Sequence, residues 1–337
     1  MTLNGSVNVE NVARVGVVVI GRNEGERLVR CLDSLKRAGA TDIVYVDSGS
    51  TDDSVKEAEK RNASIVKLDL TRPFTAGRAR NEGFELLVRQ CPDIGFVQFV
   101  DGDCELAPNW LSKALDFLDH DPQVAIVCGR RQEKYPGASP YNKLCDMEWN
   151  TPVGEADACG GDALVRVGPF RHVNGFSDLL IAGEEPELCH RLRAEGWKIW
   201  RMDADMTFHD AAMYRLSQWW MRGVRSGFGY AQVWSATRKG EGTALYGQQI
   251  RRAVIWAGLL PAITVVAALH DLRFILGLFG IYALQVTRIA LRHGITHTTA
   301  WSYAFFAMLA KFPELQGVAR YVLMASRGGQ RSAILYK

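Results

Sequence analysis

Two carboxylates that stand one residue apart, directly after an apolar run, are the residues of this chain best suited to chemistry. Asp101 and Asp103 flank Gly102 and follow the apolar run 95–100. The run is typical of a buried strand, and the C-terminal ends of such strands are where open α/β sheets bind ligands. Two oxygen donors there would suit Mg²⁺ or Mn²⁺ bridging a diphosphate. An ordinary Asp-Gly turn is the alternative interpretation.

Three further polar motifs stand where a strand ends or a helix begins. Asn23 and Glu24 follow the strand-like run 15–20, and backbone N–H groups at the start of the next helix could hold an anion or the edge of a base. Asp47 ends a second strand-like run and could accept a hydrogen bond from a nucleobase or a ribose. Arg78 and Arg80 could neutralise phosphate. Asp47 could alternatively be a turn former, and Arg78 and Arg80 could lie on a solvated helix face.

A pair of carboxylates precedes a later helical segment. Glu184 and Glu185 stand just ahead of the helix expected over 188–197. Carboxylates near a helix N-terminus are stabilised as anions, and a general base must be an anion. The alternative is a helix cap. The two residues are therefore candidate bases for abstracting a proton.

The elements that would position these residues alternate between strand and helix. Apolar spacing predicts helices that include 28–35, 76–89 and 110–118, and β-branched runs predict strands over 15–20, 42–47, 64–68, 96–100 and 124–128. This alternation favours an α/β fold with a mostly parallel central sheet flanked by helices. The segment 130–157 has no clear period and is expected to be a long excursion, and 198–202 is expected to be a short strand.

The last third of the chain is apolar enough to enter a membrane. Two apolar runs, 253–269 and 274–291, are separated by the polar segment 270–273. Each is near the lower edge of the ~17–25 residues that cross a bilayer. Basic residues flank the pair, as the positive-inside rule requires when both flanks are cytoplasmic, and Arg288 must snorkel or face protein. The pattern predicts a helical hairpin in the membrane. Buried core helices and a shallow re-entrant hairpin are the alternatives.

We therefore expect four parts: a catalytic domain over 1–235, a basic juxtamembrane linker over 236–252, the hydrophobic hairpin over 253–292, and an interfacial helix with a basic tail over 293–337. The net charge of +3 does not point to nucleic acid, so no nucleic-acid partner is expected. The seven cysteines show no CxxC spacing, which favours reduced thiols in the cytosol over a disulfide framework. The polar residues 1–11 show no apolar signal-peptide region.

Taken in order, these motifs resemble those of the inverting family-2 glycosyltransferases, which have the GT-A nucleotide-sugar-binding fold. The resemblance covers about residues 15–229 and rests on five motifs: Gly21-Arg22-Asn23-Glu24, Val46-Asp47-Ser48-Gly49-Ser50-Thr51-Asp52, Ala79-Arg80-Asn81, Asp101-Gly102-Asp103 and Gly183-Glu184-Glu185-Pro186-Glu187-Leu188. The resemblance implies a GT-A catalytic domain joined to the C-terminal membrane-associated helical region.

The resemblance also implies roles for single residues. The nucleotide-sugar site would comprise Asn23, Glu24, Asp47, Arg78, Arg80, Asp101 and Arg222. Asp47 would contact the base, Asp101 the ribose, and Asp103 the metal on the diphosphate. His209 would complete the metal site, with a packed or solvated histidine as the alternative. Glu185 matches the family's base, although the Glu-Glu pair leaves the choice between Glu184 and Glu185 open.

Two places depart from the family's pattern. Ser48 stands where many members carry a second aspartate after Asp47, so one contact to the base would be remodelled. The segment Gln218-Trp219-Trp220-Met221-Arg222 resembles the Gln-x-x-Arg-Trp element of processive synthases with shifted spacing. Trp219 or Trp220 would lie near the acceptor, as would Gly161 and Asp162 in a turn that resembles the family's acceptor side.

The expected reaction is a metal-dependent, inverting transfer of a sugar from a nucleotide-sugar donor to a membrane or lipid-linked saccharide acceptor in cell-envelope or exopolysaccharide assembly. A UDP-sugar is the favoured donor, and Mn²⁺ or Mg²⁺ the cofactor. Membrane lipids are expected partners, and the catalytic domain is expected to face the cytoplasm at the cytoplasmic membrane. The alternatives are transfer to polyprenyl phosphate and a non-catalytic nucleotide-binding scaffold of an envelope-assembly complex.

Overall fold

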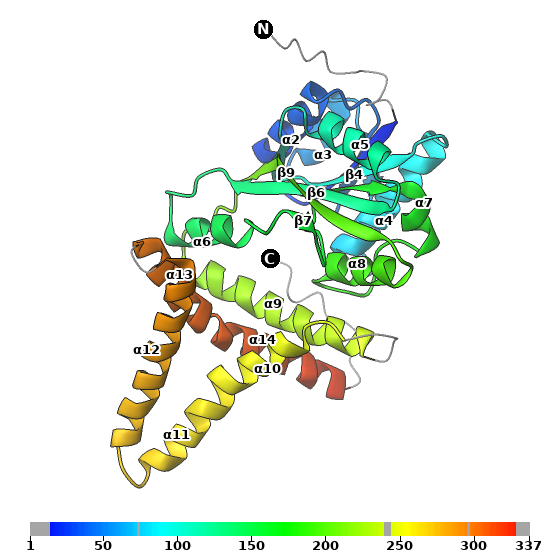
Figure 1. The fold of residues 1–337 in the computed structure, drawn as a ribbon. Helices are drawn as coiled ribbons and strands as arrows, with labels where there is room; N and C mark the ends of the chain where they lie inside the picture. Colours follow the sequence, from blue (N-terminus) through cyan, green and yellow to red (C-terminus); the bar gives the residue numbers. More distant parts are fainter. Residues whose placement is uncertain (1–13, 73–74, 239–243, 295–296, 328–337) are drawn as a thin grey trace. The chain divides into compact units, whose positions relative to one another are not determined.

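The computed structural model describes residues 14–72, 75–238, 244–294 and 297–327. The chain divides into two compact units, Met1–Tyr214 and Arg215–Lys337, and Figure 1 shows the elements of each. The first unit contains the sheet. The second is helical and begins before residue 235, so it includes a helix that the sequence analysis assigned to the catalytic domain.

One half of the sheet in the first unit is parallel. It runs in the order β3 (Ser64–Lys67), β2 (Ile43–Asp47), β1 (Val15–Gly21) and β4 (Phe96–Asp101), with parallel pairing throughout. The connections are α2 (Glu26–Arg37), α3 (Ser54–Lys60) and α4 (Ala76–Gln90). The strands are apolar runs because helices cover both faces of such a sheet. The expected strand and helix alternation is confirmed here.

The other half of the sheet is mixed, so the expectation of a mostly parallel sheet was wrong beyond β4. Strand β8 (Ala163–Arg166) is antiparallel to β4 and to β6 (Val124–Glu133), whereas β9 (Lys198–His209) is parallel to β6. Strands β5 (Cys104–Leu106) and β7 (Gly154–Glu155) pair with β9 in antiparallel fashion. A parallel neighbour needs a crossover connection, whereas the chain returns from β6 to the antiparallel β8 through the segment that joins them.

That segment is the excursion expected over 130–157, and it contains regular structure that the sequence did not predict. It carries α6 (Pro140–Glu148) and strand β7. Strand β9 is also longer than the short strand expected over 198–202. Later in the chain, α7 (Val167–His172) and α8 (Glu184–Ala194) precede β9. Helix α8 begins at the two candidate bases rather than after them, which places both carboxylates in its first turn.

Helix α4, which carries Arg78 and Arg80, packs closely against the sheet. A Cβ atom on Gly83 of α4 would lie 2.5 Å from Val18 Cγ1 of β1, so only glycine lets the helix approach this strand so closely. The apolar face of α2 is also buried, with Leu28, Cys31, Leu32 and Leu35 fully inaccessible, as their spacing predicted. Helix α5 (Trp110–His120) packs on β6 and β9 and contributes the fully buried Trp110.

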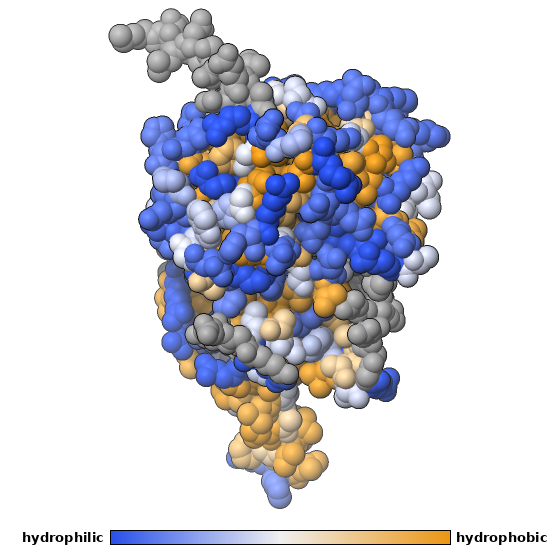
Figure 2. Space-filling view, turned by 90° about the vertical axis from the view of Figure 1, so that its right-hand side faces the viewer, coloured by the Kyte–Doolittle hydropathy of each residue, from blue (hydrophilic) through white to orange (hydrophobic). Residues whose placement is uncertain are grey.

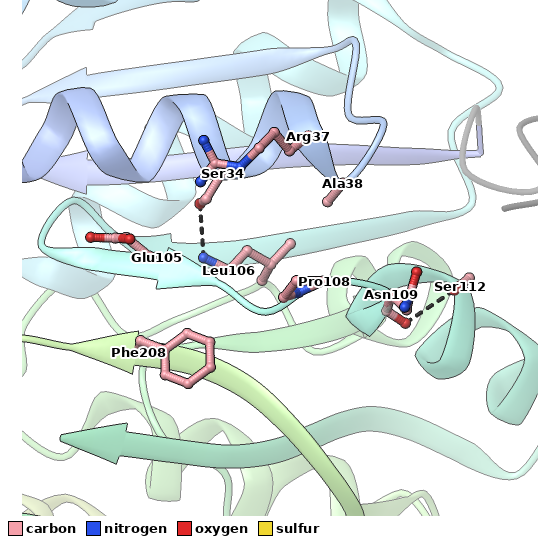
Figure 3. Close-up of a pocket in the computed structure, with 9 residues that line it drawn as sticks. All are labelled: Ser34, Arg37, Ala38, Glu105, Leu106, Pro108, Asn109, Ser112 and Phe208. Atoms are coloured by element: carbon pink, nitrogen blue, oxygen red, sulfur yellow. Dashed lines mark hydrogen bonds between the residues drawn. The ribbon is translucent and has the colours of Figure 1, made fainter. Parts of the chain in front are cut away.

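A small pocket of about 310 Å³ opens in the first unit, away from the predicted site residues. It is formed by the end of α2, strand β5 and the start of α5, with Phe208 of β9 as a further lining residue (Figure 3). Its lining residues are Ser34, Arg37, Ala38, Glu105, Leu106, Pro108, Asn109, Ser112 and Phe208. No predicted site residue is among them, so we do not assign the chemistry to this pocket.

The second unit consists of helices, two of which form an apolar hairpin. Its elements are α9 (Leu216–Thr237), α10 (Gly247–Ala253), the π-helical segment η1 (Val254–Leu259), α11 (Leu260–Ala268), α12 (Arg273–His293), α13 (Thr298–Leu309) and α14 (Lys311–Ser326). Two helical stretches, Gly247–Ala268 and Arg273–His293, have the length and composition of membrane spans. Most of their side chains are exposed, and Figure 2 shows apolar residues covering the hairpin down to a hydrophilic tip.

Two glycines allow helices α9 and α14 to approach each other closely. A Cβ atom on Gly227 of α9 would lie 1.9 Å from the carbonyl oxygen of Glu314, and one on Gly317 of α14 would lie 2.1 Å from that of Val224. The two backbones are therefore in direct contact. Trp219 packs against Phe306 of α13, and the Trp220 indole donates to Gln316 of α14.

Candidate active site

The polar residues predicted at strand ends meet at one edge of the sheet. The register of the parallel strands places Gly21 beside Asp47 and Ile20 beside Asp101. The end of β9 brings His209 opposite Cys104, the residue after Asp103. The loops that follow the carboxyl ends of parallel strands gather at one edge, and this is the physical reason that residues distant in sequence come together here.

Arg80 links three carboxylates at this edge. Its guanidinium donates to Asp101 Oδ1 at 2.9 Å and to Glu184 Oε1 at 2.8 Å, and it lies 3.3 Å from Glu185 Oε1. The side chain is 3% exposed, and burial disfavours its charge. The attraction of the three carboxylates outweighs burial and holds the pKa of Arg80 above its usual range. The buried cation therefore allows three acidic groups to stand close together, since each would otherwise repel the others.

Arg131 of β6 anchors Asp101 from its other side. It lies 3.1 Å from Asp101 Oδ2 and 2.7 Å from Asp162 Oδ2. Asp162 is fully buried and also accepts hydrogen bonds from the Asp101 amide and the Thr207 hydroxyl. Asp162 therefore orients Asp101 and Arg131 within the protein. Its predicted contact with an acceptor stays a prediction.

The two glutamates of α8 differ in their surroundings. The side chain of Glu184 is 6% exposed and that of Glu185 is 16% exposed. Burial, followed by repulsion from Glu185, raises the pKa of Glu184 to about 7, against the attraction of Arg80. Glu185 Oε1 stands on the side of Gly161, where a Cβ atom would lie 3.2 Å from it. Glu184 is thus the more enclosed of the pair, and Glu185 the one nearer to open space.

Asp103 and His209 form the pair that could hold a metal ion. Asp103 Oδ2 and His209 Nε2 lie 3.2 Å apart. Adjacent ligands of an octahedral ion with bonds of about 2.1 Å lie roughly 3.0 Å apart, so the pair has suitable spacing. His209 Nδ1 is buried without a hydrogen-bond partner in the described residues, and the ring packs edge-on against Trp149. A carboxylate and an imidazole also match the ligands that Mn²⁺ accepts.

The predicted base-binding turn is ordered by its own hydrogen bonds. Asp47 accepts from the amides of Gly49 and Ser50, and Asn23 Oδ1 accepts from the amide of Thr51 at 2.7 Å. Glu24 pairs with Arg27 at 2.6 Å. The turns after β1 and β2 are thus joined into one surface beside Asp101. Their contacts with a nucleotide stay predictions.

Four predicted residues are not among the contacts described above. Arg78 is 2% exposed, pairs with Glu82 and donates to the carbonyl oxygens of Asp69 and Arg72, so its guanidinium holds the loop before α4. The other three are Trp219, Trp220 and Arg222, which all belong to α9 in the second unit. Their proposed place near acceptor and pyrophosphate stays a prediction.

Several residues that support the site were not singled out from the sequence. Glu133 accepts from the amides of Tyr135 and Ala211, which fixes the segment directly after His209. Asn81 holds the segment before α8 through the backbone of Phe176 and the side chain of Asp178. Asn81 stands next to Arg80 in the quoted motif and could have been inferred. Nothing in the spacing pointed to Arg131 or Glu133.

The sheet, the carboxylates at its edge and the buried arginine between them define a glycosyltransferase with the GT-A fold. Residues 16–170 match the sequence model of Glycosyl transferase family 2. This region is a family-2 glycosyltransferase domain, and the family expected from the motifs is confirmed.

Two curated relatives share this region. The O-antigen chain rhamnosyltransferase RfbN of Salmonella typhimurium is 25% identical over 203 residues, which are 55% of this chain and 63% of the relative. The pre-mycofactocin glycosyltransferase of Mycobacterium tuberculosis is 27% identical over 209 residues, which are 58% of this chain and 42% of the relative. The aligned segments thus span less than two thirds of each relative.

A solved structure shares the fold over most of the chain. The mannosyltransferase PcManGT from Pyrobaculum calidifontis, solved in complex with GDP-Man and Mn²⁺, aligns with a TM-score of 0.62 and 16% identity over 92% of this chain and 87% of that one. At this identity the likeness establishes the fold. It confirms the expectation of a GT-A domain.

Proposed function

We propose that the protein transfers a sugar, with inversion at the anomeric carbon, from a nucleotide-sugar to an acceptor hydroxyl. The observation that carries this proposal is the placement of Glu184 and Glu185 beside Asp101, all held by the buried Arg80. The proposed base thereby stands next to Asp101, the predicted ribose contact. The family match and the relatives' names support transfer from a sugar donor.

Glu185 is the proposed base. It removes the proton from the acceptor hydroxyl while the oxygen forms a bond to the anomeric carbon. The bond from that carbon to the donor's phosphate oxygen breaks, and its electron pair leaves with the nucleoside diphosphate. Glu185 is more exposed than Glu184, and this favours it as the group that meets an acceptor. Glu184 acts through Arg80 as a positioning residue.

Asp103 and His209 would hold a divalent ion, Mn²⁺ or Mg²⁺. When bound, such an ion supplies positive charge to the leaving diphosphate. Asp47 and the turn that it orders would contact the base, and Asp101 the ribose. Both carboxylate oxygens of Asp101 are engaged by arginines, so a ribose hydroxyl would have to share an acceptor lone pair with them.

The hairpin of the second unit supports a membrane setting. Its two helical stretches number 22 and 21 residues, so each is long enough to cross a bilayer. The tip carries His270, Asp271 and Arg273, all exposed, and charges are costly within hydrocarbon. A full crossing, which delivers the tip to the far interface, is therefore favoured over a re-entrant hairpin. We propose the cytoplasmic membrane as the location and a lipid-linked saccharide as the acceptor.

A panel of nucleotide-sugars tests the proposal. The full chain in lipid is assayed for metal-dependent release of nucleoside diphosphate with membrane extract as acceptor. Asp103→Ala and Glu185→Gln should each lower transfer by about a hundredfold or more without loss of the folded state. Glu195→Gln, at the other end of α8 and 53% exposed, is the matched control. Near-normal turnover by Asp103→Ala or Glu185→Gln would overturn the corresponding assignment.

Transfer to polyprenyl phosphate is the second candidate, and the apolar hairpin favours it because that acceptor resides in the membrane. A phosphate acceptor is already an anion and needs no base. The double variant Glu184→Gln/Glu185→Gln would then retain activity with polyprenyl phosphate. Loss of that activity would favour the hydroxyl acceptor. Binding of UDP with Mn²⁺ and no transfer with any donor would instead indicate a non-catalytic scaffold.

A further inference from the structure

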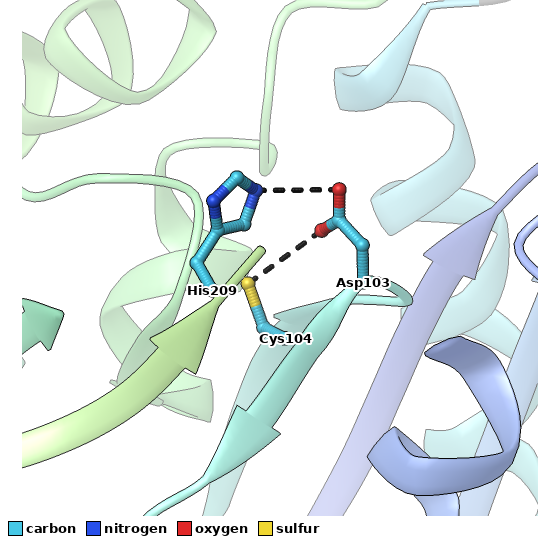
Figure 4. Close-up of side chains that lie close together, drawn as sticks. All are labelled: Asp103, Cys104 and His209. Carbon is cyan, nitrogen blue, oxygen red and sulfur yellow. Dashed lines mark hydrogen bonds and ion pairs between the residues drawn. The ribbon is translucent and has the colours of Figure 1, made fainter. Parts of the chain in front are cut away.

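A cysteine thiol stands beside the proposed metal pair. Cys104 of β5 is the direct cross-strand partner of His209 of β9. Directly opposed residues of an antiparallel pair project from the same face of the sheet, so the thiol and the imidazole are neighbours. Figure 4 shows Cys104 of β5, His209 of β9 and Asp103, in the turn just before β5, close together.

The spacing of the three side chains matches a small coordination sphere. One ligand atom from each lies within 4.8 Å of the other two. Asp103 Oδ2 is 3.2 Å from His209 Nε2, and Asp103 Oδ1 is 3.6 Å from Cys104 Sγ. In a tetrahedral site with metal bonds of about 2.0 Å to nitrogen and oxygen and 2.3 Å to sulfur, such donors lie roughly 3.3 to 3.6 Å apart. The two separations from Asp103 are close to these values, and the third lies within 4.8 Å.

A second cluster at Cys104 lacks the open carboxylates that a cation needs. Asp101 and Asp162 also lie near this thiol. Arg131 bridges these two carboxylates, and Arg80 binds Asp101 from the other side. Their negative charge is therefore already matched by guanidinium groups. By contrast, the side chains of Asp103 and His209 are 24% and 14% exposed, so an ion from solvent can reach them.

We propose that Cys104 gives this site a second binding mode, in which Asp103, His209 and Cys104 together hold a thiophilic divalent ion such as Zn²⁺. The proposal rests on the Asp103–His209 pair of the proposed function. As the metal–sulfur bond forms, the thiol proton passes to solvent, and nothing is oxidised or reduced. Hard ions such as Mg²⁺ and Mn²⁺ gain little from sulfur, whereas zinc binds thiolate strongly. Zinc at low concentration would displace the hard ion and block transfer.

Cobalt provides a readout that does not depend on activity. The full chain in lipid or detergent is titrated with Co²⁺, a spectroscopic substitute for zinc, and the thiolate-to-cobalt charge-transfer absorption is recorded. We expect the band in the natural chain and its loss in Cys104→Ser and Cys104→Ala. Two variants are used because either one alone could disturb this fully buried position. Zinc affinity, measured by competition with a chromophoric chelator, should fall by at least about tenfold in both, with Mn²⁺ affinity changed by less than about threefold.

Cys189→Ala is the matched control. Cys189 is buried, and its sulfur lies 3.6 Å from that of Cys159, so this pair is another place in the described part of the chain where a thiophilic ion could bind through sulfur. The control should keep both the band and the zinc affinity. A band that survives in the Cys104 variants, or one lost in Cys189→Ala, would overturn the proposal. Cobalt binding without a thiolate-to-cobalt band would overturn the role of Cys104 but not the metal site at Asp103 and His209. If neither Co²⁺ nor Mn²⁺ bound at all, both proposals would be overturned.

Discussion

A side chain of even one carbon at Gly161 would collide with Arg80. A Cβ atom there would lie 2.6 Å from the guanidinium Nη2 and 3.0 Å from Asp101 Oδ2. Arginine ends are usually free to move aside, but this one is 3% exposed and held by three carboxylates. The backbone of the predicted acceptor turn therefore lies directly against the charged centre of the site.

We accordingly expect Gly161→Ala to lower transfer by about tenfold or more, because displacing Arg80 moves Asp101 and the two glutamates away from their positions. Initial rates at saturating donor would measure the effect. The neighbouring Gly160 offers a close control, since a Cβ atom there meets nothing within 4 Å. Gly160→Ala should retain the natural rate. Equal loss in both variants would show that the turn's flexibility matters rather than the contact with Arg80.

Replacing Arg80 itself should affect both folding and catalysis. Arg80→Ala would leave buried carboxylates without their cation, which typically costs about 3 to 5 kcal/mol. Arg80→Lys keeps the charge but loses the planar fork whose two Nη groups reach Asp101 and Glu184 at once, so it should fold and still lose most of the activity. Thermal unfolding and transfer rates separate the two effects. Arg61→Lys is the control, because Arg61 also pairs with two carboxylates, Asp33 and Glu57, outside the site.

The raised pKa of Glu184 makes a prediction about pH. A carboxyl with a pKa of about 7 when folded and about 4.5 when unfolded binds more protons in the folded state between these values. Its contribution to the free energy of unfolding is complete below pH 4.5 and is lost as pH rises through 7. From pH 6 to pH 8 the natural chain should lose about 1 kcal/mol relative to Glu184→Gln, which cannot ionise.

Melting temperatures of the two proteins at pH 6, 7 and 8 would test this. The melting temperature of Glu184→Gln should increase relative to that of the natural chain as the pH increases. Glu195→Gln, at the exposed end of the same helix, should show no such trend. A difference that stays constant with pH, or moves in the opposite direction, would contradict a raised pKa of about 7 for Glu184.

Because α9 and α14 are in backbone contact at Gly227, we expect no larger residue to be tolerated at this position. Gly227→Ala would place a methyl group 1.9 Å from the Glu314 carbonyl oxygen, so the helices must separate. Overpacking of this kind typically costs about 1 to 3 kcal/mol. Protease sensitivity of the second unit in lipid should increase. Gly280→Ala on α12, where a Cβ atom meets nothing within 4 Å, should behave like the natural chain.

The sequence predicted the parallel half of the sheet well because that half is built from local alternation. Asp47 and Asp101 were correctly expected to end strands, and the register then places them at one edge. Arg78 and Arg80 looked equivalent in sequence. Two residues apart on a helix they point about 200° apart, so Arg80 meets the carboxylates and Arg78 binds the preceding loop.

The antiparallel half of the sheet could not be predicted from local strand and helix alternation. Arg131 and Asp162 meet because β8 enters the sheet between β4 and β6, and nothing local in either strand specifies that arrangement. The same holds for Glu133, which lies in register with His209 through a pairing of distant strands. The bulges between β6 and β9 further shift this register, so counting residues could not have matched the partners.

The ion pair between Arg80 and Glu184 joins residues 104 positions apart in the chain. The family match ends at residue 170, before Glu184 is reached. A fragment cut at that point would bury Arg80 against Asp101 and leave its other N–H groups without the glutamates that satisfy them. During synthesis, too, the charged centre cannot close until α8 has emerged. The stretch that matches the family model therefore contains only part of the proposed site, and the residues that follow it supply the rest.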